Sequence, residues 1–116
     1  MTIVGLGLDA QDLTDRAKTL LSGPARVLLR TARCGAAGWM DERGLPYSNL
    51  DALYDQADDF DDLQDRIAAE IERLSEEGEL VYGVLDLRDE SVRRLAVGHP
   101  ALTCLPKDAD GRPLCR

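Results

Sequence analysis

The sequence predicts an α/β fold: a three-layer sandwich in which a mostly parallel sheet of roughly four to five strands carries helices on both faces. Short apolar segments alternate along the chain with segments whose apolar residues recur at helical spacing. Residues 80–85 are apolar without polar alternation, which is typical of a strand buried on both faces. Strands separated by helices in this way pair in parallel, so the alternation also predicts the strand direction.

The chain begins with a short apolar run, residues 2–8, that contains Gly5-x-Gly7. We interpret this run as a buried first strand that turns sharply into a helix at its carboxyl end. Ligands of open α/β sheets bind at that end of the strands. The third glycine of a dinucleotide fingerprint is missing, so a phosphate-cradling role is not shown, and a tight turn is the favoured explanation of the two glycines.

The remaining elements follow from periodicity and from stop signals. Helices are expected at residues 11–22, 36–43, 61–77 and 89–98, with a turn of helix at 50–54 capped by Ser48 or Asn49. Strands are expected at 25–30, 80–85 and 101–105, with a brief one at 45–47. The clearest helix, 61–77, carries one apolar stripe and is followed by the terminator Gly78; the stripe consists of Leu63, Ile67, Ile71 and Leu74.

Length and charge limit the possible functions. With 116 residues the chain is expected to form one domain over residues 1–106, followed by a polar tail at 107–116. A net charge of −8 argues against nucleic acid and against an anionic membrane surface as partners. No apolar run has the length of a membrane span, and no signal peptide is visible. Three scattered cysteines without a Cys-x-x-Cys pair predict reduced thiols in a cytoplasmic protein.

Several polar groups resemble chemical sites but have simpler explanations. Five aspartates surround the start of the 61–77 helix, where negative charge favours the helix dipole and adjacent carboxylates diverge too much for a metal; they are Asp55, Asp58, Asp59, Asp61 and Asp62. Asp108-x-Asp110 lacks the later glutamate of a calcium loop. His99 is the single histidine and has no serine or cysteine at a suggestive offset, so we expect a loop residue.

Two arginines and one cysteine follow the second strand on the presumed ligand side. Arg30 and Arg33 are placed where a carboxylate- or phosphate-bearing ligand would approach, although salt bridges to the surplus of acidic residues explain them as well. For Cys34 no sequence feature indicates a lowered thiol pKa, so a small buried residue is the expected role.

Five motifs occur in one order: Ile3-Val4-Gly5-Leu6-Gly7, Val27-Leu28-Leu29-Arg30-Thr31-x-Arg33, Trp39-Met40-x-Glu42-x-Gly44, Leu53-Tyr54-x-x-Ala57-x-x-Phe60 and Glu77-Gly78-x-Leu80-Val81-Tyr82. Over residues 2–85 the chain thereby resembles the N-terminal half of the tetrapyrrole (corrin/porphyrin) methylase family. The most similar branch is the one fused to a nucleoside-triphosphate pyrophosphohydrolase domain.

This resemblance implies an enzyme in which S-adenosylmethionine lies between an N-terminal parallel-sheet domain and a C-terminal α/β domain. Such an enzyme aligns the sulfonium with a carbon of the macrocycle and shields both from water, so it needs no conspicuous base. By resemblance, Gly5 and Gly7 would lie under the substrate. Val84, Leu85 and Asp86 would form the turn that meets the cofactor.

The chain also departs from the family pattern. Leu8-Asp9-Ala10 stands where the family continues with Pro-Gly-Asp, and Leu85-Asp86-Leu87-Arg88 replaces a glycine-containing turn. The C-terminal half of the family is not represented, so we expect either a fragment or a short descendant without methylation. Two hypotheses follow: the N-terminal domain of a methyltransferase that is inactive by itself, or a non-catalytic ligand-sensing or interaction module. The module could form a homodimer or position a partner pyrophosphohydrolase domain. A Rossmann-type nucleotide-binding domain has only Gly5-x-Gly7 in its favour.

Overall fold

The computed structural model describes residues 1–7, 9–98 and 103–105, and within this part of the chain the sheet has five parallel strands. Their order is β3-β2-β4-β1-β5. The strands are β1 (Thr2–Gly5), β2 (Arg26–Leu29), β3 (Ser48–Asn49), β4 (Leu80–Val84) and β5 (Thr103–Leu105). The helical elements are η1 (Ala10–Asp12), α1 (Asp15–Leu21), α2 (Gly35–Glu42), α3 (Asp51–Gln56), α4 (Phe60–Glu76) and α5 (Glu90–Gly98). The predicted α/β fold class is confirmed.

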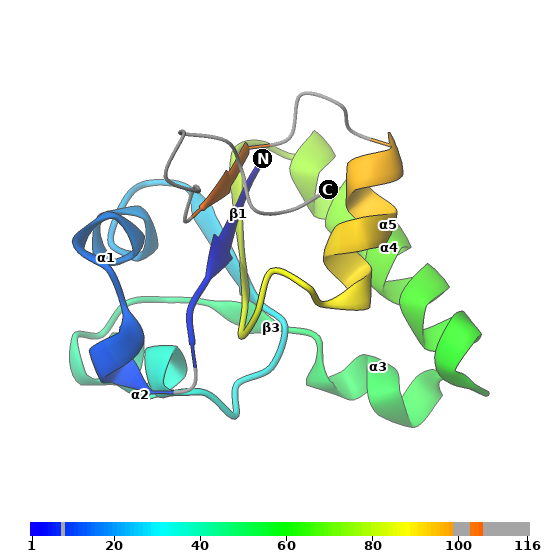
Figure 1. The fold of residues 1–116 in the computed structure, drawn as a ribbon, viewed down its shortest axis with the longest axis horizontal. Coiled ribbons are helices and arrows are strands. Elements are labelled where there is room, and N and C mark those ends of the chain that lie inside the picture. Colours follow the sequence, from blue (N-terminus) through cyan, green and yellow to red (C-terminus); the bar gives the residue numbers. More distant parts are fainter. Residues whose placement is uncertain (8, 99–102, 106–116) are drawn as a thin grey trace.

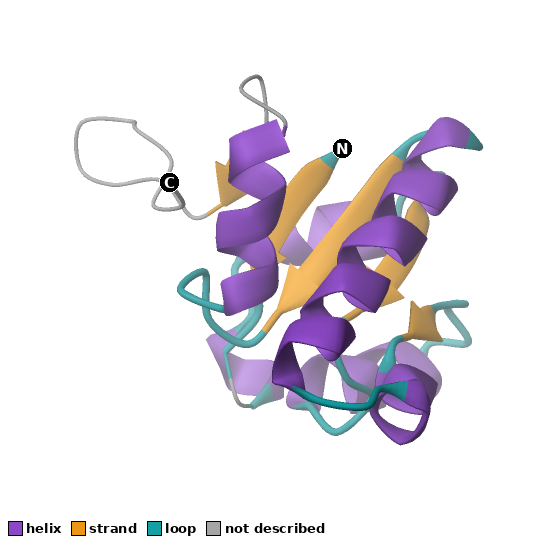
Figure 2. Ribbon diagram, turned by 90° about the vertical axis from the view of Figure 1, so that its right-hand side faces the viewer, coloured by secondary structure: helices purple, strands orange, loops and turns teal. Residues whose placement is uncertain are grey.

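The sheet is covered on both faces, with α4 and α5 on one side and α1 and α2 on the other (Figure 1). Figure 2 views the sheet through α4 and α5. Neighbouring residues of β1 divide between the faces: Ile3 packs under α4 and α5, and Val4 packs toward α1 and α2. Every residue of β4 is buried, which explains why its sequence shows no polar alternation.

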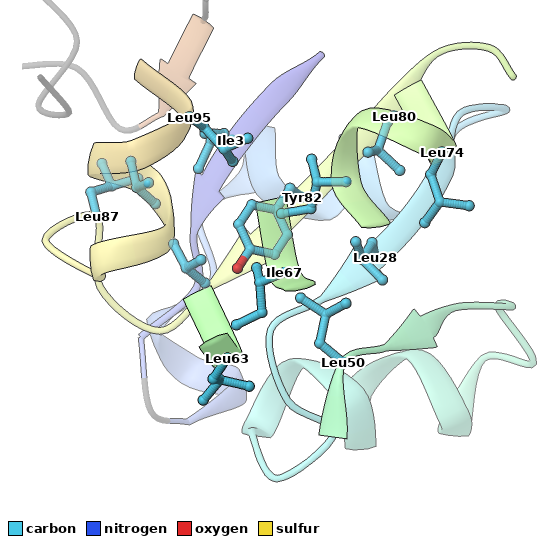
Figure 3. Packing of buried hydrophobic residues seen from close by; sticks show 13 residues of the cluster. Ile3, Leu28, Leu50, Leu63, Ile67, Leu74, Leu80, Tyr82, Leu87 and Leu95 are labelled. Atoms are coloured by element: carbon cyan, nitrogen blue, oxygen red, sulfur yellow. The ribbon is translucent and has the colours of Figure 1, made fainter. Parts of the chain in front are cut away.

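The core under α4 and α5 is built on the predicted apolar stripe (Figure 3). Ile67 and Ile71 are fully buried, and Leu63 and Leu74 are nearly so. The helix starts where the Asp59 carboxylate accepts a hydrogen bond from Asp62 N at 2.8 Å. This bond confirms a capping role for Asp59 within the acidic group.

The region between β2 and α4 differs from the prediction. The third strand is not 45–47 but β3, which pairs Ser48 and Asn49 with the last two residues of β2. Pro46 has no N–H for a ladder, which displaces the pairing to the residues after it. Helix α3 then begins at Asp51, whose N–H donates to Asn49 Oδ1 at 3.1 Å.

The predicted helix at 11–22 is shorter and begins later. Residues 10–12 form the separate turn η1, and α1 starts after Thr14, whose Oγ1 accepts a hydrogen bond from Ala17 N at 3.0 Å. The threonine cap competes with continuation of η1 into α1. The expected end of the domain at 106 and the tail at 107–116 lie outside the described residues. Among the helices described, none combines the length and apolar character needed to cross a membrane.

Candidate functional site

The turns that follow β1, β2 and β4 meet at the carboxyl edge of the sheet. Gly7 N donates to Leu85 O at 3.0 Å, and Arg30 N donates to Gly83 O at 2.8 Å. Gly5, the last residue of β1, is paired with Val84 in the parallel ladder. The candidate residues from three distant stretches of the chain are therefore neighbours at one edge.

The glycine turn after β1 is filled by the chain itself. Gly7 has a φ of +71°, which favours glycine, and a Cβ at this position would lie 2.4 Å from Asp12 Cβ. The Asp12 carboxylate in turn accepts a hydrogen bond from Asp9 N at 3.0 Å. Asp12 thus occupies the space that a side chain at position 7 would need. This arrangement agrees with the prediction that the glycines of Gly5-x-Gly7 serve a tight turn.

The turn after β4 is also bonded to itself. Val84 is fully buried, Leu85 is half-buried, and Asp86 is exposed. Arg88 N donates to Asp86 Oδ1 at 2.8 Å, and Arg88 Nη2 donates to Asp86 Oδ2 at 2.7 Å. The side-chain bond from Arg88 lowers the pKa of Asp86 to about 2. Of the three predicted cofactor residues, Leu85 alone lines the depression described below.

Replacing Arg88 with methionine should raise the pKa of Asp86 toward about 3.9, the value of a free aspartate. Because the folded-state pKa is lowered, the stabilisation from this pair is present above about pH 4 and is lost as the pH falls through about 2. NMR titration of the carboxyl carbon measures the shift. Arg93→Met, on the exposed face of α5, is the control and should leave the pKa of Asp86 unchanged. If the pKa of Asp86 in Arg88→Met equals the wild-type value, Arg88 is not the cause of its lowering.

An open depression of about 690 Å³ lies at this edge, beyond the ends of β2, β3 and β4. It is lined by Thr31, Arg33, Asp51, Ala52, Tyr54, Asp55 and Leu85. A smaller depression of about 520 Å³ lies at the opposite edge, near the start of β2. We regard the larger one as the candidate site because crevices at the carboxyl ends of parallel strands are where α/β sheets bind ligands.

Arg30 lies beside this depression and is buried. It is 8 % exposed, and its guanidinium carbon lies 4.9 Å from the centroid of the Tyr54 ring. Its Nε approaches Asp89 Oδ2 at 3.6 Å, too far for a hydrogen bond. Nε and Nη1 are buried without a hydrogen-bond partner among the described residues. Asp89 thus partly balances the charge of Arg30 but does not satisfy the hydrogen-bond donors of its guanidinium.

Comparisons with protein families, with curated proteins and with solved structures found no match. The resemblance to tetrapyrrole methylases remains a prediction.

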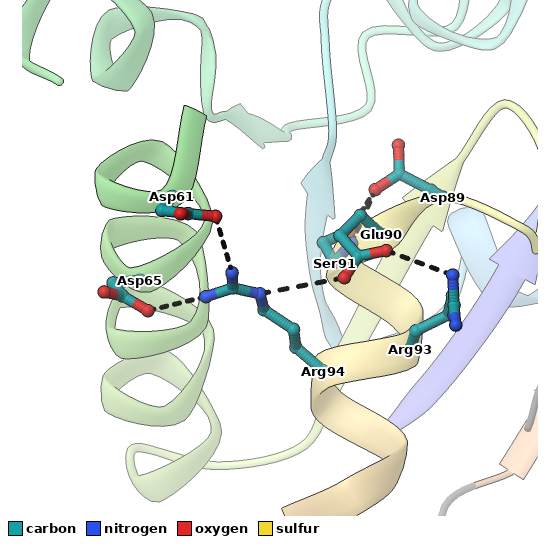
Figure 4. Close-up of polar contacts among 7 residues, drawn as sticks. All are labelled: Asp61, Asp65, Asp89, Glu90, Ser91, Arg93 and Arg94. Atoms are coloured by element: carbon teal, nitrogen blue, oxygen red, sulfur yellow. Dashed lines mark hydrogen bonds and ion pairs between the residues drawn. The ribbon is translucent and has the colours of Figure 1, made fainter. Parts of the chain in front are cut away.

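Asp89 connects Arg30 to a chain of buried hydroxyl groups. Its Oδ1 accepts hydrogen bonds from Ser91 N at 2.9 Å and from Ser91 Oγ at 2.5 Å (Figure 4). Ser91 Oγ lies 2.7 Å from the Tyr82 hydroxyl, and burial raises the pKa of Tyr82. Asp89 was predicted as a helix start, and the contact of Tyr54 with Arg30 and the bonds of Ser91 to Asp89 and Tyr82 were not predicted. The one available signal was a tyrosine hydroxyl inside an otherwise apolar strand.

The other candidates have local roles. Cys34 is half-buried, and its Sγ donates to Thr31 O at 3.4 Å. Asp61 pairs with Arg94 of α5 at 3.4 Å, which links two helices (Figure 4). Within residues 1–7, 9–98 and 103–105, no group of three side chains is placed to hold a metal ion. His99, Asp108 and Asp110 lie outside the described residues.

Proposed function

We propose that this chain binds a small molecule at the carboxyl edge of its sheet, as the N-terminal domain of an S-adenosylmethionine-dependent methyltransferase of the tetrapyrrole methylase family. The observation that supports this proposal is the convergence of the turns after β1, β2 and β4 beside one depression, with Gly7 bonded to Leu85. The resemblance places the substrate and the cofactor at these same turns. Because the family cleft is completed by a second domain, the property to test in this chain is binding.

The cofactor fits the observed turn only in part. Leu85 offers apolar surface to the depression. However, Arg88 N is already bonded to Asp86, whose carboxylate is paired with the Arg88 side chain. A turn that satisfies its own polar groups has fewer of them left for S-adenosylmethionine, so we derive no methyl-transfer step for this chain.

The turn after β4, which satisfies its own polar groups, also favours a second candidate function: a non-catalytic ligand-sensing or interaction module with the same fold. In this function the depression binds another small molecule, a second copy of the chain or a pyrophosphohydrolase partner. For both candidates we propose a cytoplasmic location, because the cysteines are scattered and show no paired spacing.

Ala52 provides the test because it is exposed on α3 and lines the depression. Calorimetric titration with S-adenosylmethionine, S-adenosylhomocysteine and uroporphyrin should show binding to the wild-type chain. Ala52→Trp should weaken it strongly by placing an indole ring in part of the depression. Ala69→Trp, at an exposed position of α4 outside the depression, is the matched control and should bind normally.

Sedimentation of the same proteins separates the two candidates. Binding of either adenosyl compound supports the methylase-type domain, and its loss in both tryptophan variants would contradict the location of the site. Absence of adenosyl binding, together with a homodimer that Ala52→Trp dissociates, supports the interaction module. A monomer that binds none of the three compounds would overturn the methylase-type proposal.

A further inference from the structure

Arg30 is a buried positive charge beside the candidate site, and part of its guanidinium makes no hydrogen bond to the described residues. Nε and Nη1 are buried and donate to no atom of the described residues. Leaving such donors unpaired is unfavourable, and a charged acceptor satisfies them best. We propose that Arg30 binds an oxyanion group, a carboxylate or a phosphate, of the ligand that occupies the depression. This inference rests on the proposed binding function and specifies the chemistry of the ligand.

Asp89 is not a sufficient partner for Arg30. One oxygen of Asp89 already accepts two hydrogen bonds from Ser91, which hold the carboxylate at the start of α5. The other oxygen stays 3.6 Å from Arg30 Nε. Charge-assisted hydrogen bonds between guanidinium and carboxylate are about 2.7–2.9 Å long. The observed pair therefore lowers the cost of burying Arg30 without using its donors.

The contact with Tyr54 leaves those donors available. A guanidinium that stacks on an aromatic ring uses its face, while its N–H groups point outward in the plane. Tyr54 is 50 % exposed and forms part of the wall of the depression. Thr31, the residue after Arg30, lines the same space. Arg30 is not itself one of the lining residues; its contact with Tyr54 and its neighbour Thr31 connect it to the wall of the depression.

The charges on the wall determine how strongly an anion would bind. Arg33 is exposed and adds a second positive charge. Asp51 uses one carboxylate oxygen to accept a hydrogen bond from Ala32 N at 3.0 Å. Asp55 is exposed on the same wall and opposes an anion. An oxyanion at Arg30 and Arg33 should consequently bind more tightly when Asp55 is replaced by asparagine.

NMR of arginine Nε–Hε groups tests the proposal directly on the wild-type chain. Sodium phosphate and sodium acetate are titrated separately against sodium chloride at constant ionic strength. The Arg30 signal should shift saturably with phosphate, with acetate or with both, and not with chloride. A shift with one anion alone identifies that chemistry as the one recognised, and absence of a saturable shift with either anion overturns the proposal.

Three variants complete the experiment. Arg30→Met keeps the apolar stem and removes two buried donors that have no partner among the described residues, but it also removes the ion pair with Asp89 and the contact with Tyr54. The unliganded protein should therefore melt near the wild-type temperature while anion affinity falls by about tenfold or more. Arg16→Met, at an exposed position of α1, should bind the anion normally. Asp55→Asn should bind it more tightly. Unchanged affinity in Arg30→Met overturns the proposal.

The two proposals can fail independently. Binding of an adenosyl compound or of uroporphyrin without any effect of Arg30→Met would refute the role of Arg30 and leave the binding domain intact. Anion binding that depends on Arg30, without binding of those three compounds, would support the oxyanion site and remove the methylase-type assignment.

Discussion

Replacing Gly35 with alanine should lower the free energy of unfolding by about 3 kcal/mol. Gly35 is the first residue of α2, and a Cβ there would lie 2.2 Å from Ala10 N and 2.5 Å from the carbonyl carbon of Asp9. Both atoms belong to the backbone, which cannot rotate away as a side chain can. Urea denaturation monitored by circular dichroism measures the loss.

Gly38 provides the control within the same helix. A Cβ at Gly38 would meet no atom of the described residues within 4 Å, and the residue is exposed in the interior of α2. Gly38→Ala should therefore stabilise the protein by about 1 kcal/mol, the usual helix-propensity difference. Equal effects of the two substitutions would refute the close packing of η1 against α2.

Ile67→Ala should destabilise the protein by about 2–5 kcal/mol. Ile67 is fully buried between α4 and the sheet, next to Leu28 and Tyr82 in the core of Figure 3. The loss combines the transfer of apolar surface with the cavity that rigid strands leave unfilled. Thermal and urea denaturation should agree on its size.

Phe60 provides the comparison on the same helix, because it is a large apolar residue that is 62 % exposed. Phe60→Ala should change stability by no more than about 0.5 kcal/mol. A larger loss would mean that Phe60 is covered in solution, by a second copy of the chain or by another partner. Repeating the measurement at several protein concentrations distinguishes a dimer from the monomer.

The elements with strong local signals were predicted correctly. Helix α4 has a continuous apolar stripe, an aspartate cap and a glycine after its end, so its sequence contains most of the information that forms it. The strand β3 has no such signal, because its two residues are polar and its place is set by pairing with β2, which no local pattern shows. The start of α1 was misplaced because a threonine cap interrupts a continuous apolar pattern.

The candidate site was likewise predicted in part. The parallel arrangement was enough to bring Gly5, Gly7, Leu85 and Arg30 to one edge, since all of them follow strand ends. Tyr54 on α3 and Asp89 at the start of α5 were not predicted as neighbours of Arg30. Their contacts depend on how two helices pack beside a strand end, and no local pattern encodes that geometry.

The sequence by itself determined the alternation of strands and helices, the burial of β4 on both faces and the sheet edge at which the candidate residues meet, because periodicity is a local property and the helical connections set the strand direction. Only the tertiary structure decided that β2 lies beside β4 and β1 between β4 and β5, and that two buried donors of Arg30 find no partner in the part of the chain that the structure describes. The physical reason is that burial and hydrogen-bond satisfaction belong to the space between elements, which forms only when all of them pack together.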